Sequence, residues 1–165
     1  MTTEQTGLDY KKILIMVDFS AYSTPAFYQG LRIAKQFDAE AHVLYVVEPI
    51  GALESGFSIK QKAFDMQKLE DHVRWRIDEL FKNKGLEAVD RRKVKTAILS
   101  GKPYQEGVKY AEENDIDLIV LGSKGRSSFN KIFVGSQSER VLRLSHCQVL
   151  IVKSDDENLE EEAEE

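Results

Sequence analysis

A glycine-rich, basic segment follows the apolar run 117–121 and could hold a phosphate group. Its landmarks are Gly122, Gly125, Gly135 and Ser136, with two residues between the first pair of glycines and nine between Gly125 and Gly135. Glycine lets a backbone approach a ligand closely and adopt positive φ, and a helix start offers unpaired N–H groups to an anion. The spacing therefore predicts a nucleotide phosphate site.

The charge of the same segment suits a polyphosphate. Lys124, Arg126 and Lys131 lie between Asp117 and Glu139, an interval without an acidic side chain, whereas the whole chain has a formal net charge of −5 at pH 7. A local excess of positive charge attracts anions. We expect Lys124 and Arg126 to be either exposed loop residues or side chains that screen phosphate charge.

A second polar group, Asp18, closes the apolar run 12–17. If the strands follow the order 3-2-1-4-5, Asp18 and Gly122 end neighbouring strands and flank one crevice, where the winding of the sheet reverses. The carboxylate could then accept hydrogen bonds from a sugar or a base while the glycine segment holds phosphates. The alternative is a structural aspartate that closes the strand in a turn.

Ser136 has two compatible roles. In the sequence Ser136-Gln137-Ser138-Glu139 its hydroxyl oxygen can act as the N-cap of a capping box. Its hydroxyl proton and the free amides of the first helical turn could still bind a phosphate.

Short apolar runs alternate with helical patterns along the chain. The runs predict strands over 12–17, 42–47, 94–99, 118–121 and 148–152, of which 94–99 shows the polar alternation of an edge strand. Helices are expected from Ser23 or Thr24 to about 37, from about 60 to 84 with Gly85 as the stop, from 103 to 114, and from 136 to about 145, with a loop over 50–58. This order predicts an α/β fold with a doubly wound, five-stranded parallel sheet, strand order 3-2-1-4-5 and helices on both faces.

Length and composition favour one domain in a reducing compartment. The 165 residues, 42% of them hydrophobic, divide into a flexible N-terminal segment (1–10), a nucleotide-binding domain (11–153) and an acidic disordered tail (154–165). A single cysteine, Cys147, excludes an internal disulfide, and no apolar run approaches the roughly 20 residues that span a bilayer. We expect a cytoplasmic protein without membrane insertion, and its acidic balance argues against nucleic-acid binding.

The sequence lacks an evident catalytic arrangement. Gly101-Lys102 is followed by Pro103, so the phosphate-loop motif is missing, and there is no Gly-x-Gly-x-x-Gly. The histidines His42, His72 and His146 fall on separate elements without metal-ligand spacing, and the neighbours His146 and Cys147 should point to opposite faces of a strand. We expect a binding protein, with at most slow ATP hydrolysis.

These motifs together resemble the ATP-binding branch of the universal stress protein family. The resemblance rests on Gly122-x2-Gly125-x9-Gly135-Ser136, on 17–20 and 99–103, and on the closing run 149–152, and it covers about 11–153. It implies that Asp18 contacts adenosine, that Val46 meets adenine through its backbone, and that the ribose and phosphates are held by Gly122, Lys124, Gly125, Gly135 and Ser136. The chain departs from the family pattern at Met16-Val17, Gln137 and Gln148.

The resemblance further implies a nucleotide-dependent regulator in stress response. The cofactor would be ATP with Mg²⁺ or Mn²⁺, and the partners a second copy, joined through the last strand, and a regulatory protein. Two alternatives stay open at this point: an ATP-hydrolysing or nucleotidyl-transferring enzyme of the same broad fold, and a protein-interaction module with a vestigial site.

Overall fold

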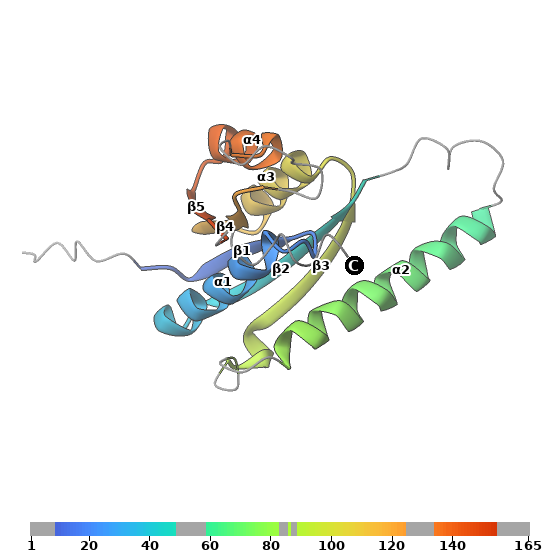
Figure 1. Cartoon of the computed structure of the whole chain (residues 1–165), viewed down its shortest axis with the longest axis horizontal. Helices are drawn as coiled ribbons and strands as arrows, with labels where there is room; N and C mark the ends of the chain where they lie inside the picture. The colour runs from blue at the N-terminus through green and yellow to red at the C-terminus, as the bar shows by residue number, and fades with distance from the viewer. Residues whose placement is uncertain (1–8, 49–58, 83–85, 87–88, 125–133, 155–165) are drawn as a thin grey trace, which may run out of the picture.

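The computed structural model describes residues 9–48, 59–82, 86, 89–124 and 134–154, with backbone only for 59–65. Five parallel strands form one sheet in the order β3-β2-β1-β4-β5, as predicted (Figure 1). The strands are β1 (Lys12–Val17), β2 (Glu40–Val47), β3 (Val94–Ser100), β4 (Leu118–Gly122) and β5 (Gln148–Val152). The helices are α1 (Ser23–Phe37), α2 (Ile59–Phe81), α3 (Pro103–Glu113) and α4 (Ser136–Leu144), with a short 3-10 turn η2 (Arg91–Lys93) before β3.

Each face of the sheet carries its own apolar core. Helices α1 and α2 cover one face, and α3 and α4 cover the other (Figure 1). Alternate residues of β1 enter the two cores, with Ile13 and Ile15 on the α1 side and Leu14 on the α3 side, all fully buried. Because β1 and β4 are buried on both faces, their sequences are continuous apolar runs, and for this reason they could be recognised.

The two outer strands differ from the central ones. The prediction of an edge position for the run 94–99 is confirmed, since β3 pairs only with β2 and has no fully buried residue. At the opposite edge β5 pairs only with β4, and Val149 to Val152 are half-buried. Within the described part of the chain, the outward edge of β5 has no strand beside it.

The helix starts are the main departures from expectation. The capping box at Ser136 is wrong, because Gly135 occupies the N-cap of α4 with φ −60° and ψ 149° and Ser136 is the first helical residue. In α1 the N-cap is Tyr22, whereas the Ser23 hydroxyl donates to the Ser20 carbonyl at 3.2 Å and therefore does not cap the helix. Both differences arise from tertiary or backbone contacts that compete with a side-chain cap.

Other boundaries agree with the sequence to within a few residues. Strand β2 begins two residues earlier than predicted, at Glu40, and α2 ends at Phe81 rather than Lys84. The loop expected over 50–58 and the stop at Gly85 lie outside the described residues. Among the helices that the structure describes, none is long and apolar enough to cross a membrane.

Two residues that depart from the family pattern make bonds between elements. The Gln137 side-chain oxygen accepts the Tyr104 backbone N–H at 3.2 Å, which pairs an amide of the first turn of α3. The Gln148 side-chain oxygen accepts the Tyr10 hydroxyl at 2.5 Å and so links the start of β5 to the residues before β1. These glutamines replace family residues without disturbing the fold.

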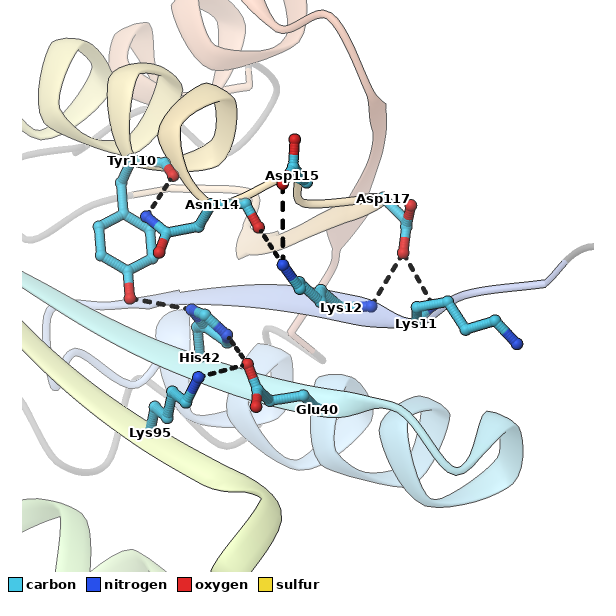
Figure 2. Close-up of polar contacts among 9 residues, drawn as sticks. All are labelled: Lys11, Lys12, Glu40, His42, Lys95, Tyr110, Asn114, Asp115 and Asp117. Atoms are coloured by element: carbon cyan, nitrogen blue, oxygen red, sulfur yellow. Dashed lines mark hydrogen bonds and ion pairs between the residues drawn. The ribbon is translucent and has the colours of Figure 1, made fainter.

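Polar side chains join the elements where the strands begin (Figure 2). The Asp117 carboxylate accepts the backbone N–H groups of Lys11 and Lys12 at 2.7 and 2.8 Å, which fixes the start of β1 beside β4. The Lys12 ammonium donates to the Asn114 carbonyl at 2.9 Å at the end of α3. Side chains thus tie together the amino ends of β1 and β4 and the end of α3.

Candidate functional site

The turn after β1 and the end of β4 meet at the carboxyl edge of the sheet. The two strands are neighbours, with Ile15 opposite Val120, and a Cβ built on Gly122 would lie 2.9 Å from the Tyr22 carbonyl carbon. Only a residue without a side chain lets these two backbones come so close. The predicted juxtaposition of the residues after β1 with the glycine segment is therefore present.

Glycine is needed at position 122 for this close approach of the backbones and not for a positive φ. The only glycine with positive φ among the described residues is Gly101, so the expectation of positive φ is wrong for Gly122 and Gly135. The Gly122 carbonyl accepts the Ser138 hydroxyl at 2.8 Å in a buried hydrogen bond, which fixes α4 to the end of β4.

Asp18 lies in a tight hydrogen-bonded turn. Its Oδ1 atom accepts the Ser20 backbone N–H at 3.0 Å and the Ser20 hydroxyl at 2.6 Å, and its own N–H donates to the Ser23 hydroxyl at 3.3 Å. The structural role considered for this residue is thus observed. A carboxylate has about four acceptor positions, and the two bonds from Ser20 are both made to Oδ1.

Lys124 is not an exposed loop residue. Its relative exposure is 8%, and its ammonium lies 5.4 Å from the centre of the Tyr22 ring. An ammonium over an aromatic face is stabilised by the ring quadrupole. The positive charge is therefore held beside the turn that follows β1, at the start of the glycine segment.

Backbone hydrogen bonds join the two ends of the glycine segment to each other and to β5. The Ser123 N–H donates to the Val152 carbonyl at 3.0 Å, and the Gly135 N–H donates to the Ser123 carbonyl at 2.7 Å. The Gly135 amide is thus used within the protein. Ser136 is exposed at the first position of α4, where the amides of Ser136, Gln137 and Ser138 precede the first intrahelical bond, from Glu139 to Gly135.

Val46 lies near the end of β2, on the α3 side of the sheet. The Val47 carbonyl accepts the Gly101 N–H at 2.9 Å and so faces β3. Because successive residues of a strand direct their backbone groups to opposite neighbours, the Val46 carbonyl faces the β1 side, just where β1 ends at Val17. A backbone acceptor therefore points toward the residues around Asp18.

The predicted site residues are thus brought to one edge, with one exception. Gly125 lies outside the described residues, as do Arg126 and Lys131. Sequence reasoning missed Tyr22, whose carbonyl and ring contact Gly122 and Lys124, and Phe19, which has φ 60°. Neither has a local signal, since both contacts depend on the tertiary arrangement.

The remaining reactive side chains of the described chain lie elsewhere. No group of three or more His, Cys, Asp or Glu residues among the described residues could hold a metal ion. Burial raises the pKa of the Cys147 thiol. The Nδ1 atom of the neighbouring His146 lies 3.8 Å from the Glu112 carboxylate. Cys147 and His146 both line an open hollow at the amino ends of the strands, at the opposite edge of the sheet from the Asp18 turn.

Comparisons with known proteins agree with this architecture. The model of the universal stress protein family matches residues 9–153. Universal stress protein MJ0531 of Methanocaldococcus jannaschii is 36% identical over 156 residues, covering 87% of this chain and 82% of that protein. Universal stress protein MJ0577 of the same organism is 32% identical over 158 residues, covering 87% of this chain and 95% of that protein.

Solved structures extend the likeness to three dimensions. The structure of MJ0577 has a TM-score of 0.67 at 32% identity and covers 90% of this chain and 99% of its own. UspA of Lactobacillus plantarum has a TM-score of 0.67 at 28% identity and covers 88% and 99%. A universal stress protein solved in complex with cAMP has a TM-score of 0.64 at 23% identity, covering 90% and 100%, and shows a shared fold. This chain belongs to the universal stress protein family.

Proposed function

We propose that this protein binds ATP at the carboxyl edge of its sheet and acts as a nucleotide-dependent regulator in stress response. The observation that carries the proposal is the contact between Gly122 and Tyr22, which brings the Asp18 turn and the glycine segment together at the carboxyl edge of the sheet, where we place a nucleotide crevice. Such a crevice, beside the point where strand order reverses, is where doubly wound α/β proteins bind ligands.

The two sides of this crevice suit the two ends of a nucleotide. Asp18 and the Val46 carbonyl supply acceptors for the ribose hydroxyls and the adenine amino group. On the other side, Lys124 supplies positive charge, Gly122 and Gly125 would allow a close backbone approach, and the first turn of α4, which starts at Gly135 and Ser136, would direct its amides toward the phosphates. Mg²⁺ or Mn²⁺ would accompany the triphosphate, held mainly by phosphate oxygens and water.

The likeness to the protein solved with cAMP is consistent with an adenine nucleotide as the ligand class. The bound cAMP is a property of that other protein. For this chain, the choice of ATP rests on the length of the glycine segment and on its three cationic side chains, which are more than a single phosphate would need. Binding rather than turnover is proposed because the sequence has no phosphate-loop motif and no other evident catalytic arrangement.

We further propose a cytoplasmic homodimer joined through β5. The outward edge of this strand offers backbone groups to a second copy, and Leu142 and Leu144 of the adjoining α4 are 51% and 56% exposed. An uncovered apolar edge invites pairing, which a closed twofold dimer would control. The segments 1–10 and 154–165 would remain outside the domain formed by 11–153.

The test is thermal unfolding of the purified protein with and without ATP and Mg²⁺, together with identification of any nucleotide that co-purifies. ATP at 100 times its dissociation constant should stabilise the fold by about 2.7 kcal/mol. CTP at the same concentration is the control for non-specific ionic effects. An unchanged melting temperature at millimolar ATP, with no heat of binding by calorimetry, would exclude the proposed function.

A further inference from the structure

Arg76 of helix α2 contacts the Asp18 turn. Its guanidinium carbon lies 5.2 Å from the centre of the Phe19 ring, and its Nη2 atom lies 3.5 Å from the Phe19 carbonyl oxygen. Both contacts are made to the residue that follows Asp18. Arg76 thus reaches from a helix that is far away in the sequence to the turn at the edge of the crevice.

Phe19 has a backbone conformation that a bulky residue rarely adopts. Its φ is 60°, in the left-handed region, which is unfavourable for a residue with a Cβ. Such a conformation persists where the surroundings hold it. The ring is held by Tyr45, stacked at 5.1 Å between centroids with 26° between planes, and by Arg76.

The conformation of Phe19 determines the shape of the Asp18 turn. Phe19 lies between Asp18 and Ser20, and the Ser20 N–H and hydroxyl both donate to the Asp18 Oδ1 atom. If Phe19 left the left-handed region, Ser20 would turn away and the carboxylate would lose both bonds. The contacts are therefore connected in series, from Arg76 to Phe19 to Asp18.

We propose that Arg76 is a positioning residue of the nucleotide site, which makes nucleotide affinity depend on how α2 is docked. This inference rests on the proposed function. The docking of α2 is set on its inner face by Val73 and Ile77, which are 1% and 3% exposed, whereas Arg76 and Trp75 lie on its exposed side. Since coupling between two equilibria is reciprocal, bound nucleotide would in turn stabilise α2 in its docked position.

The experiment measures ATP affinity by calorimetry for the parent, Arg76→Ala and Arg74→Ala. Arg74 is the matched control because it is an exposed arginine two positions away on the same helix and lines the hollow toward β3 instead. An exposed cation–π contact is worth a change of about two- to five-fold in an equilibrium constant. We expect Arg76→Ala to weaken ATP binding by this factor and Arg74→Ala to bind like the parent.

A double-mutant cycle with Phe19→Leu separates positioning from a general loss of stability. If Arg76 acts through Phe19, adding Arg76→Ala to Phe19→Leu should cause no further loss of affinity. Equal affinity of Arg76→Ala and the parent, or losses that multiply in the double variant, would overturn the inference. Failure of the parent itself to bind ATP would instead refute the proposed function, so the two failures are distinct.

Discussion

The Nδ1 atom of His42 lies 2.9 Å from the Tyr110 hydroxyl and joins β2 to α3 inside the protein (Figure 2). The other ring nitrogen, Nε2, lies 2.5 Å from the Glu40 Oε1 atom, which also accepts the Lys95 ammonium at 2.8 Å. A carboxylate can only accept, so Nε2 carries the proton and Nδ1 accepts the Tyr110 hydroxyl. His42 is 2% exposed and thus sits neutral in a network that is complete on both sides.

This network predicts a loss of stability on mild acidification. Burial lowers the pKa of His42 in the fold, although Glu40 opposes this shift, while Lys95 and Lys12 support it. The unfolded chain therefore binds this proton more readily, and stability falls as the pH drops below about 6.5, the ordinary histidine value. A hydrogen bond from Lys95, followed by one from His42, lowers the pKa of Glu40, which extends the loss to lower pH as Glu40 protonates.

The measurement is urea unfolding between about pH 5 and pH 8 for the parent, His42→Phe and His146→Phe. His42→Phe should be less stable at neutral pH and have a flatter pH dependence. His146→Phe is the control for replacing an imidazole by a phenyl ring at an exposed position. Parallel pH profiles for His42→Phe and the parent would show that another group titrates.

Gly122→Ala is expected to destabilise the fold by roughly 1–3 kcal/mol, the usual cost of overpacking. The added methyl group would meet the backbone of Tyr22, which cannot move without shifting the start of α1. Gly107→Ala is the matched control, because its methyl group would meet the flexible end of Met16 at 2.5 Å and alanine is favoured in a helix. Equal melting temperatures of the two variants would contradict this account of Gly122.

The layout of the fold could be predicted from the sequence because the burial of each strand and helix determines its pattern of apolar and polar residues. The runs 12–17 and 148–152 match β1 and β5 residue for residue, the alternation of strands and helices predicted a parallel sheet, and the strand order 3-2-1-4-5 is the one observed. The polar alternation of 94–99 correctly indicated an edge. These signals are local, since each reflects which faces of a single element are covered.

The details of the site could be predicted only in part. The positions of Asp18 and Gly122 followed from topology, whereas the burial of Lys124 and the left-handed Phe19 depend on Tyr22, Tyr45 and other residues distant in the sequence. The capping box at Ser136 had a clear local signal and was still wrong. There the Gly135 backbone begins the helix, because its N–H is paired with Ser123 and its carbonyl accepts from Glu139.

Lys124→Met should weaken ATP binding by about ten-fold or more while leaving the fold intact. Methionine keeps the apolar stem against Tyr22 and removes the charge, and a hydrogen bond to a charged group is worth about 1.5–3 kcal/mol. Lys109→Met is the matched control, since Lys109 is exposed on α3 and pairs with Glu113 at 3.8 Å. The ATP affinity of both variants is measured by calorimetry in the presence of Mg²⁺. Equal affinities would show that Lys124 does not contribute to ATP binding.

The last prediction concerns assembly and follows from the direction of the backbone groups in β5. The Val152 carbonyl accepts the Ser123 N–H and so faces β4, which means that Leu150 also faces β4 and that Ile151 directs its N–H to the free edge. Ile151→Pro removes an outward donor and should give a folded monomer, because proline is tolerated at a sheet edge.

Leu150→Pro is the contrasting variant, since it removes a bond to β4 and should destabilise the domain itself. Sedimentation at micromolar concentration, with circular dichroism as the check on folding, distinguishes the two effects. We expect a dimeric parent, a monomeric and folded Ile151→Pro, and an unstable Leu150→Pro. A parent that sediments as a monomer would show that β5 does not pair with a second copy, and a dimeric Ile151→Pro would place the interface on another surface.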